Sequence, residues 1–257
     1  MTTSTATVGR LTALGRAEIT LLVRNRSALF VALLMPALMV GAIKGSLGNL
    51  DLDGTGLTVA GTVMTSGIGM ALLFVVHMNL VSAYVARRED LVLKRLRTGE
   101  ASDTEILTGT ALPSAAVALA QCAALLVAGV AFFGLGAPER PGLLVAGVLV
   151  GIVMTAALAA ATAAVTRTVE SAQITTLPFL LVSSLGSGLF LPLEMLPERM
   201  ASVCEFLPMT GVMTLVRAGW LGGADTGEVT WALGAALAWT GLAVFAVRRW
   251  FRWEPRR

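Results

Sequence analysis

The stretch RREDLVLKRLRTGEASDTEILTG, residues 87–109, carries ten of the chain's 35 charged side chains. Long apolar segments lie on both sides of it, and each is apolar enough to lie in the hydrocarbon of a bilayer. A membrane protein that gathers charge into an internal loop usually exposes that loop to the aqueous phase. The stretch therefore predicts an all-α polytopic membrane protein in which two spanning helices are joined by a charged connection.

Composition favours a membrane protein over a soluble one. Of 257 residues, 56% are hydrophobic and 14% are charged, and the mean hydropathy is +0.79. A soluble domain with this balance could not cover its surface with polar groups. Basic residues near the predicted span ends account for the net charge of +3, so we expect no nucleic-acid partner. Cys122 and Cys204 lie far apart and give neither a disulfide framework nor metal-ligand spacing.

Six segments are candidates to span the bilayer, since a helix needs about 20 mainly apolar residues to cross it. None of the six contains Asp, Glu, Lys or Arg. They are residues 28–43, 59–86, 106–134, 142–165, 174–191 and 229–247.

The basic residues predict the orientation of these spans. With both termini in the cytoplasm, fifteen Lys and Arg residues lie inside and four lie outside, whereas the acidic residues divide equally. Cytoplasmic loops carry the excess of Lys and Arg, so the prediction is N-in and C-in, with residues 87–109 in the cytoplasm. Trp250 and Trp253 beside the C-terminal arginines are typical of an interfacial anchor.

Residues 8–26 are predicted to form an amphipathic helix in the inner membrane interface. Apolar residues recur there at helical spacing, and Arg24 and Arg26 mark the junction with the first span. The alternative is a simple N-terminal extension of that span. The apolar positions are Leu11, Leu14, Ala17, Leu21 and Leu22.

The charged stretch itself is predicted to hold a short helix, a glycine break and a second helix start. Acidic residues precede Leu91 and basic residues lie just before Gly99, as the helix dipole and a C-terminal glycine favour. Ser102 and Glu105 then form the capping-box pattern at the start of the third span.

The leucines of this short helix, Leu91, Leu93 and Leu96, cannot all be buried by so small an element. A protein partner could cover them. The alternative is an ordinary positively charged loop whose leucines rest on the membrane.

The charged stretch also resembles the cytoplasmic loop of the membrane subunits of type-2 ATP-binding-cassette (ABC) exporters, most closely in the drug-resistance branch. This chain departs from that loop at three places. It has Leu91–Val92 where the loop commonly has Gly-Thr, Thr98–Gly99 where the loop has Thr-Pro, and Thr110 where the loop has Lys. The matching residues are Arg88–Glu89, Leu93–Lys94–Arg95–Leu96–Arg97–Thr98, Ser102, Glu105–Ile106–Leu107 and Gly109.

The resemblance covers nearly all of residues 1–257 and implies one membrane domain of the bacterial cytoplasmic membrane. It implies that the loop (residues 87–105) contains a coupling helix that docks in a groove of an ATPase subunit. Charged residues would position that subunit, and Leu91, Leu93 and Leu96 would fill its groove. The charged positions are Arg88, Glu89, Lys94, Arg95 and Arg97.

Residues 192–223 match the re-entrant helical pair that this family has between spans five and six. Pro192, Pro197 and Pro208 interrupt what would otherwise be a hydrophobic span. The charged residues of this segment could hydrate the exit of a transport path, or could be ordinary charge at the outer interface. They are Glu194, Glu198, Glu205 and Arg217.

The sequence has no G-x-x-x-x-G-K-[ST] phosphate loop, so the chain is not expected to bind ATP or to be an enzyme. The resemblance then implies that ATP and Mg²⁺ bind a separate ATPase subunit and that a second permease copy or paralogue completes the path. The expected cargo is a hydrophobic or amphipathic small molecule, such as an antibiotic. A lipid or lipid-linked glycan exporter is the alternative within the class, and a stand-alone channel is the alternative outside it.

A proton relay and an intramembrane protease are two alternatives to an ABC permease subunit. A proton relay needs ionisable groups inside the membrane, and His77 is the one candidate in the predicted spans, so we interpret it as a packing residue. An intramembrane protease would pair His77 with Ser187, but serine between glycines is common in membrane helices.

Overall fold

The computed structural model describes residues 58–99, 102–189 and 197–254, and all regular structure in those ranges is helical. The all-α prediction is therefore confirmed for them. The predicted interfacial helix 8–26 and the first span 28–43 lie outside the described residues. The helices are α3 (Val59–Ala71), η1 (Leu72–Met78), α4 (Asn79–Glu89), α5 (Val92–Arg97), α6 (Asp103–Phe132), α7 (Pro141–Val165), α8 (Val169–Gly186), α9 (Glu198–Cys204), α10 (Pro208–Trp220) and α11 (Thr226–Trp250).

Four helices are long and apolar enough to cross a membrane: Val59–Glu89, Asp103–Phe132, Pro141–Val165 and Thr226–Trp250. They coincide with the predicted spans 59–86, 106–134, 142–165 and 229–247. The predicted span 174–191 falls on the 18-residue helix α8, which is not among the four. Its helix starts earlier than predicted because Thr168 and Ser171 form a capping box, and it ends at Gly186 shortly before Gly188, whose φ is +73°.

The first of these helices is continuous but changes its winding in the middle. Residues Leu72–Met78 form a π-helical segment between α3 and α4. Such segments are rare, and no pattern in the residues predicts this one. Here it carries His77 into the core, where the imidazole ring lies 4.2 Å from the Phe179 ring of α8.

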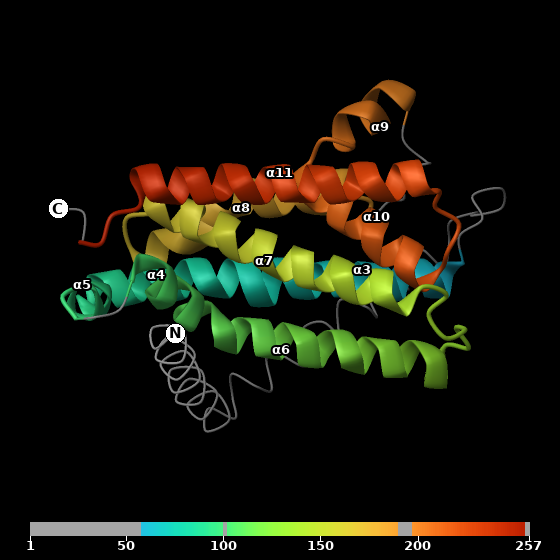
Figure 1. Cartoon of the computed structure of the whole chain (residues 1–257), viewed down its shortest axis with the longest axis horizontal. Coiled ribbons are helices and arrows are strands. Elements are labelled where there is room, and N and C mark those ends of the chain that lie inside the picture. Colours follow the sequence, from blue (N-terminus) through green and yellow to red (C-terminus); the bar gives the residue numbers. More distant parts are fainter. Residues whose placement is uncertain (1–57, 100–101, 190–196, 255–257) are drawn as a thin grey trace, which may run out of the picture.

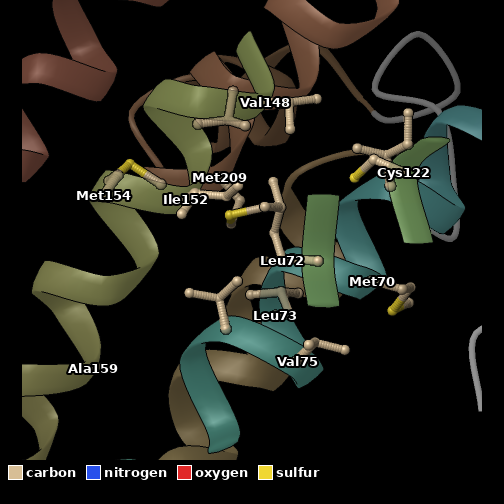
Figure 2. Packing of buried hydrophobic residues seen from close by; sticks show 14 of the residues in the cluster. Met70, Leu72, Leu73, Val75, Cys122, Val148, Ile152, Met154, Ala159 and Met209 are labelled. Carbon is tan, nitrogen blue, oxygen red and sulfur yellow. The ribbon is translucent and has the colours of Figure 1, made fainter. Parts of the chain in front are cut away.

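Small residues let the central helices approach closely. A Cβ on Gly147 of α7 would lie 2.9 Å from the Leu215 Cβ of α10, and a Cβ on Gly151 would lie 2.7 Å from Leu72. The four-residue spacing of Gly147 and Gly151 therefore places both glycines on the face of α7 that packs closely against η1 and α10. In Figure 2, Leu72 of η1 lies among Ile152 of α7 and Met209 of α10 in the buried core.

The two ends of the bundle differ. In Figure 1, α5 lies at the end of the bundle where α11 also ends, and α9 projects from the bundle toward the opposite end. Helices α9 and α10 occupy the predicted re-entrant segment, with Pro197 capping α9 and Pro208 as the first residue of α10. The prolines therefore start helices, as their fixed φ and missing N–H allow.

Candidate functional site

Helix α5 begins at a sharp corner after α4. The Leu91 N–H donates to the Arg88 carbonyl at 3.1 Å, and Leu91 itself has a left-handed conformation with φ +60°. Such a conformation costs a residue with a Cβ roughly 1–2 kcal/mol. The predicted short helix is confirmed as Val92–Arg97. The left-handed break, however, precedes this helix at Leu91, and Gly99 after it has no positive φ.

The three leucines of this corner have different environments. Leu93 is completely buried within the chain, Leu96 is half-buried, and Leu91 has 40% of its surface exposed. The prediction that Leu93 contacts a partner therefore does not fit its position, because helix α5 directs it inward. Leu91 and Leu96 remain available to a partner.

Arg88 also differs from the prediction, since it is 1% exposed rather than on the surface. Its guanidinium donates to the carbonyls of Ala163 at 2.9 Å, Thr166 at 2.6 Å and Arg167 at 3.3 Å. These carbonyls belong to the end of α7, where a helix leaves acceptors without partners and the dipole favours a cation. Arg88 thus ties α4 to α7 instead of meeting a partner protein.

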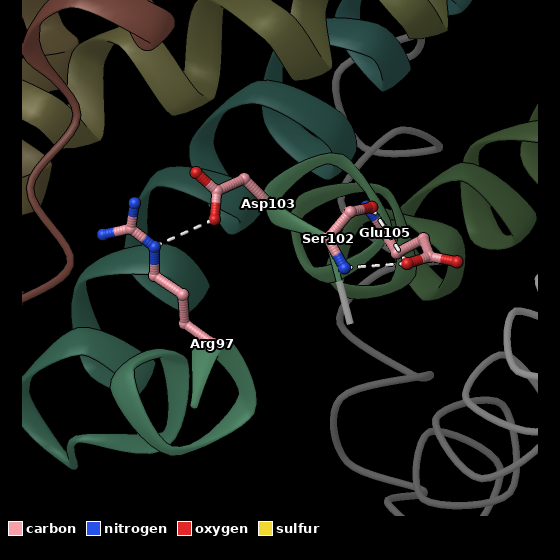
Figure 3. A network of polar contacts seen from close by, with 4 residues as sticks. All are labelled: Arg97, Ser102, Asp103 and Glu105. Atoms are coloured by element: carbon pink, nitrogen blue, oxygen red, sulfur yellow. Dashed lines mark hydrogen bonds and ion pairs between the residues drawn. The ribbon is translucent and has the colours of Figure 1, made fainter. Parts of the chain in front are cut away.

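The remaining charged residues lie on the surface of the corner. Glu89 and Arg95 are exposed, as are Lys94 and Arg97. Lys94 forms an ion pair of 2.8 Å with Glu254, and Arg97 forms one of 3.0 Å with Asp103 at the start of α6 (Figure 3). Arg95 is therefore the basic residue of α5 that presents its charge outward without an ion pair among the described residues.

The residues after α11 pack against α5. The Arg97 guanidinium lies 5.0 Å from the centre of the Trp253 ring, which in turn contacts Phe251 edge-on at 5.1 Å. Trp253 was predicted to be an interfacial anchor, and its contact with Arg97 was not predicted. The separation of these residues from α5 along the chain left no local pattern from which to infer it.

The start of α6 confirms the predicted capping box. The Glu105 N–H donates to the Ser102 hydroxyl at 3.3 Å, and the Ser102 N–H donates to the Glu105 carboxylate at 2.8 Å (Figure 3). The first turn of α6 is thereby fixed next to Asp103, the ion-pair partner of Arg97. Contacts of Lys94 and Arg97 therefore connect α5 to the start of α6 and to the residues that follow α11.

At the other end of the molecule, the predicted exit residues do not form a cluster that the structure describes. Glu194 lies outside the described residues, and Glu198 begins α9. Glu205 is exposed after α9, whereas Arg217 is partly buried and donates to the Gly188 carbonyl beyond the end of α8. Arg217 therefore holds the loop that follows α8.

The possible protease pair is not assembled. His77 Nδ1 lies 3.4 Å from the Thr155 carbonyl, whereas the Thr210 hydroxyl donates to Ser187 at 3.2 Å. Ser187 follows Phe179, the neighbour of His77, by eight residues, which is about 12 Å along a helix. Within the described ranges, no three His, Cys, Asp or Glu side chains are grouped so that they could hold a metal ion.

Comparison with known protein families gives a match over most of the chain. Residues 10–221 match the model of the ABC-2 type transporter membrane family. The match covers most of the chain, so the chain belongs to this family. No individual curated protein matched it.

Family membership defines the class of protein. The chain is a multi-pass membrane permease subunit of an ABC transporter, and it works in the bilayer with an ABC ATPase subunit. It is a transport subunit rather than an enzyme. The drug-resistance branch is a finer assignment that this match leaves as a prediction.

Proposed function

We propose that the chain is the permease subunit of an ATP-driven exporter, and that α5 is its coupling helix. Both termini and the α4–α5 corner face the cytoplasm, with residues 28–43 and α8 completing six spans. The distribution of Lys and Arg supports this orientation. A second copy or a paralogue supplies the other half of the path.

The observation that carries the proposal is that α5 is attached to several helices at once. Leu93 anchors α5 in the interior, and Arg88 at the end of α4 binds the end of α7. Arg97 binds the first turn of α6, and Lys94 binds Glu254 after α11. A force applied to the exposed face of α5 would therefore reach α4, α6, α7 and α11 together.

The exposed face of α5 has the chemistry that a docking surface needs. Leu91 offers apolar area at the corner, and Arg95 and Glu89 offer charges around it. Interfaces commonly combine a small apolar contact with a polar rim that sets partner and orientation. Closure of the partner ATPases on ATP would press on this face, rock the α3–α4 helix and α6, and open the path outward.

We further propose a hydrophobic or amphipathic small molecule, such as an antibiotic, as the cargo. The four candidate spans carry their charged side chains near their ends, and their middle portions are apolar apart from hydroxyls, amides and His77. A path lined in this way favours cargo that partitions into apolar surroundings. A lipid or lipid-linked glycan would also fit a path with apolar walls. Transport assays with small molecules and with lipids decide between these two classes of cargo.

Charge reversal on α5 tests the coupling assignment. Arg95→Glu is the cleanest change, because Lys94 and Arg97 also hold intramolecular ion pairs. We expect Arg95→Glu to weaken co-purification of the ATPase subunit and to reduce cargo-stimulated ATP hydrolysis. Arg199→Glu on exposed α9 is the matched control and should leave both unchanged. Normal ATPase association in Arg95→Glu and in the triple reversal of Lys94, Arg95 and Arg97 would show that α5 is not the coupling helix.

A further inference from the structure

A hollow of about 540 Å³ lies between α6, α7 and α11 at the end of the bundle that carries α5. It has the size of pockets that hold small molecules, roughly 300–1,000 Å³. Small side chains leave the space unfilled, because two alanines of α6 and three of α7 line it. On each helix two of them are four residues apart and thus on one face. The alanines are Ala111, Ala115, Ala156, Ala157 and Ala160.

The hollow opens toward the surroundings of the helix bundle. Leu112, Val153 and Val244 line it, and they are 37%, 58% and 39% exposed. All three belong to candidate membrane spans, so their exposed sides face hydrocarbon chains. A molecule that enters the hollow by this side comes from the bilayer.

One end of the hollow is polar and basic. Arg97, Asp103 and Arg248 line that end. A second hollow of about 670 Å³ adjoins it and shares Arg97, Phe251 and Trp253 as a common wall. The second hollow adds Lys94, Arg252 and Glu254, so four basic and two acidic side chains surround the pair.

The acidic side chains neutralise only part of this charge. Asp103 pairs with Arg97 and Glu254 pairs with Lys94. Arg248 and Arg252 are exposed, and among the residues that the structure describes neither forms an ion pair. An apolar hollow that continues into a basic one is complementary to a molecule with a long apolar chain and an anionic head.

We propose that the two hollows bind one anionic phospholipid, with an acyl chain between α6, α7 and α11 and the phosphate at Arg248 and Arg252. Basic pockets between membrane helices bind anionic headgroups in this way. The lipid would contact Arg97 and Trp253 and would thereby help to hold α5. The assignment of this lipid to the cytoplasmic leaflet rests on the orientation proposed above. The site itself does not depend on that orientation.

Native mass spectrometry of the full-length protein in detergent tests the site, with dioleoyl phosphatidylglycerol and dioleoyl phosphatidylcholine added in turn. We expect tighter binding of phosphatidylglycerol. Each arginine near a headgroup is worth about fivefold in affinity, so Arg248→Gln with Arg252→Gln should weaken phosphatidylglycerol binding roughly 25-fold. Arg249→Gln is the matched control, because this neighbouring exposed residue lines neither hollow.

A second pair of variants tests the apolar part. Ala156→Trp fills the space between α6 and α7 and should abolish binding of the lipid. Leu237→Trp places the same ring on an exposed site of α11 away from the hollow and should leave binding unchanged. Equal binding of the two lipids, equal losses in the double variant and in Arg249→Gln, or full binding by Ala156→Trp would each overturn the proposal. None of these readouts involves the ATPase subunit, so the lipid site and the coupling assignment can fail separately.

Discussion

Replacement of Arg88 by methionine is expected to destabilise the protein strongly, because the guanidinium caps the end of α7. Its two shorter hydrogen bonds, at 2.6 and 2.9 Å, reach the Thr166 and Ala163 carbonyls, and both of these residues are nearly inaccessible to water. A hydrogen bond with a charged partner contributes about 1.5–3 kcal/mol, so two of them contribute about 3–6 kcal/mol. Removing the cost of burying the guanidinium offsets part of this. We expect a net loss of about 2–4 kcal/mol in the free energy of unfolding.

The assay is unfolding of the purified protein in mixed micelles by titration with SDS, followed by circular dichroism. Arg95→Met is the matched control, because Arg95 is exposed on α5 and its replacement should change stability by less than about 0.5 kcal/mol. Arg88→Lys should be intermediate, since an ammonium keeps the charge but does not span the carbonyls as a planar guanidinium does. If Arg88→Met and Arg95→Met unfold at the same SDS fraction, the cap does not stabilise the structure.

Three further substitutions and one control, measured in the same titration, test local features. Leu91→Gly should raise stability by up to about 1 kcal/mol, because glycine adopts the left-handed conformation without the steric cost to leucine. A loss of stability would contradict the claim that the backbone at Leu91 is strained. Ser102→Ala should lower stability by about 1 kcal/mol by removing the N-cap of α6, and an unchanged value would mean that the cap is dispensable. Gly219→Ala should cost about 1–3 kcal/mol, because its Cβ would lie 2.4 Å from the Leu144 backbone nitrogen, whereas Gly234→Ala meets no atom within 4 Å and should be neutral or stabilising.

Features fixed by neighbouring residues could be predicted from the sequence. The capping box of Ser102 and Glu105 and the short helix after Leu91 follow from local hydrogen bonding and the helix dipole, and both are confirmed. Four of the six predicted spans coincide with helices long and apolar enough to cross a membrane, since that property depends only on length and composition.

Features that depend on distant parts of the chain could not be predicted. Arg88 looked like one more basic residue of an aqueous loop, but its partners lie 75 or more positions away at the end of α7. Leu93 looked as exposed as Leu91, because six residues of helix cannot show which face the bundle covers. The resemblance did contain one clue, since a glycine in place of Leu91 suits the left-handed corner that the structure has there.

Site-specific photo-crosslinking from α5 in the assembled transporter tests the coupling assignment most directly. A photoreactive side chain at Arg95 should form a crosslink to the ATPase subunit, and the yield should change when ATP is added. The same side chain at Met200, exposed on α9 toward the opposite end of the bundle, should form none. Crosslinks to the ATPase subunit from Met200 and none from Arg95 would contradict both the coupling role of α5 and the proposed orientation.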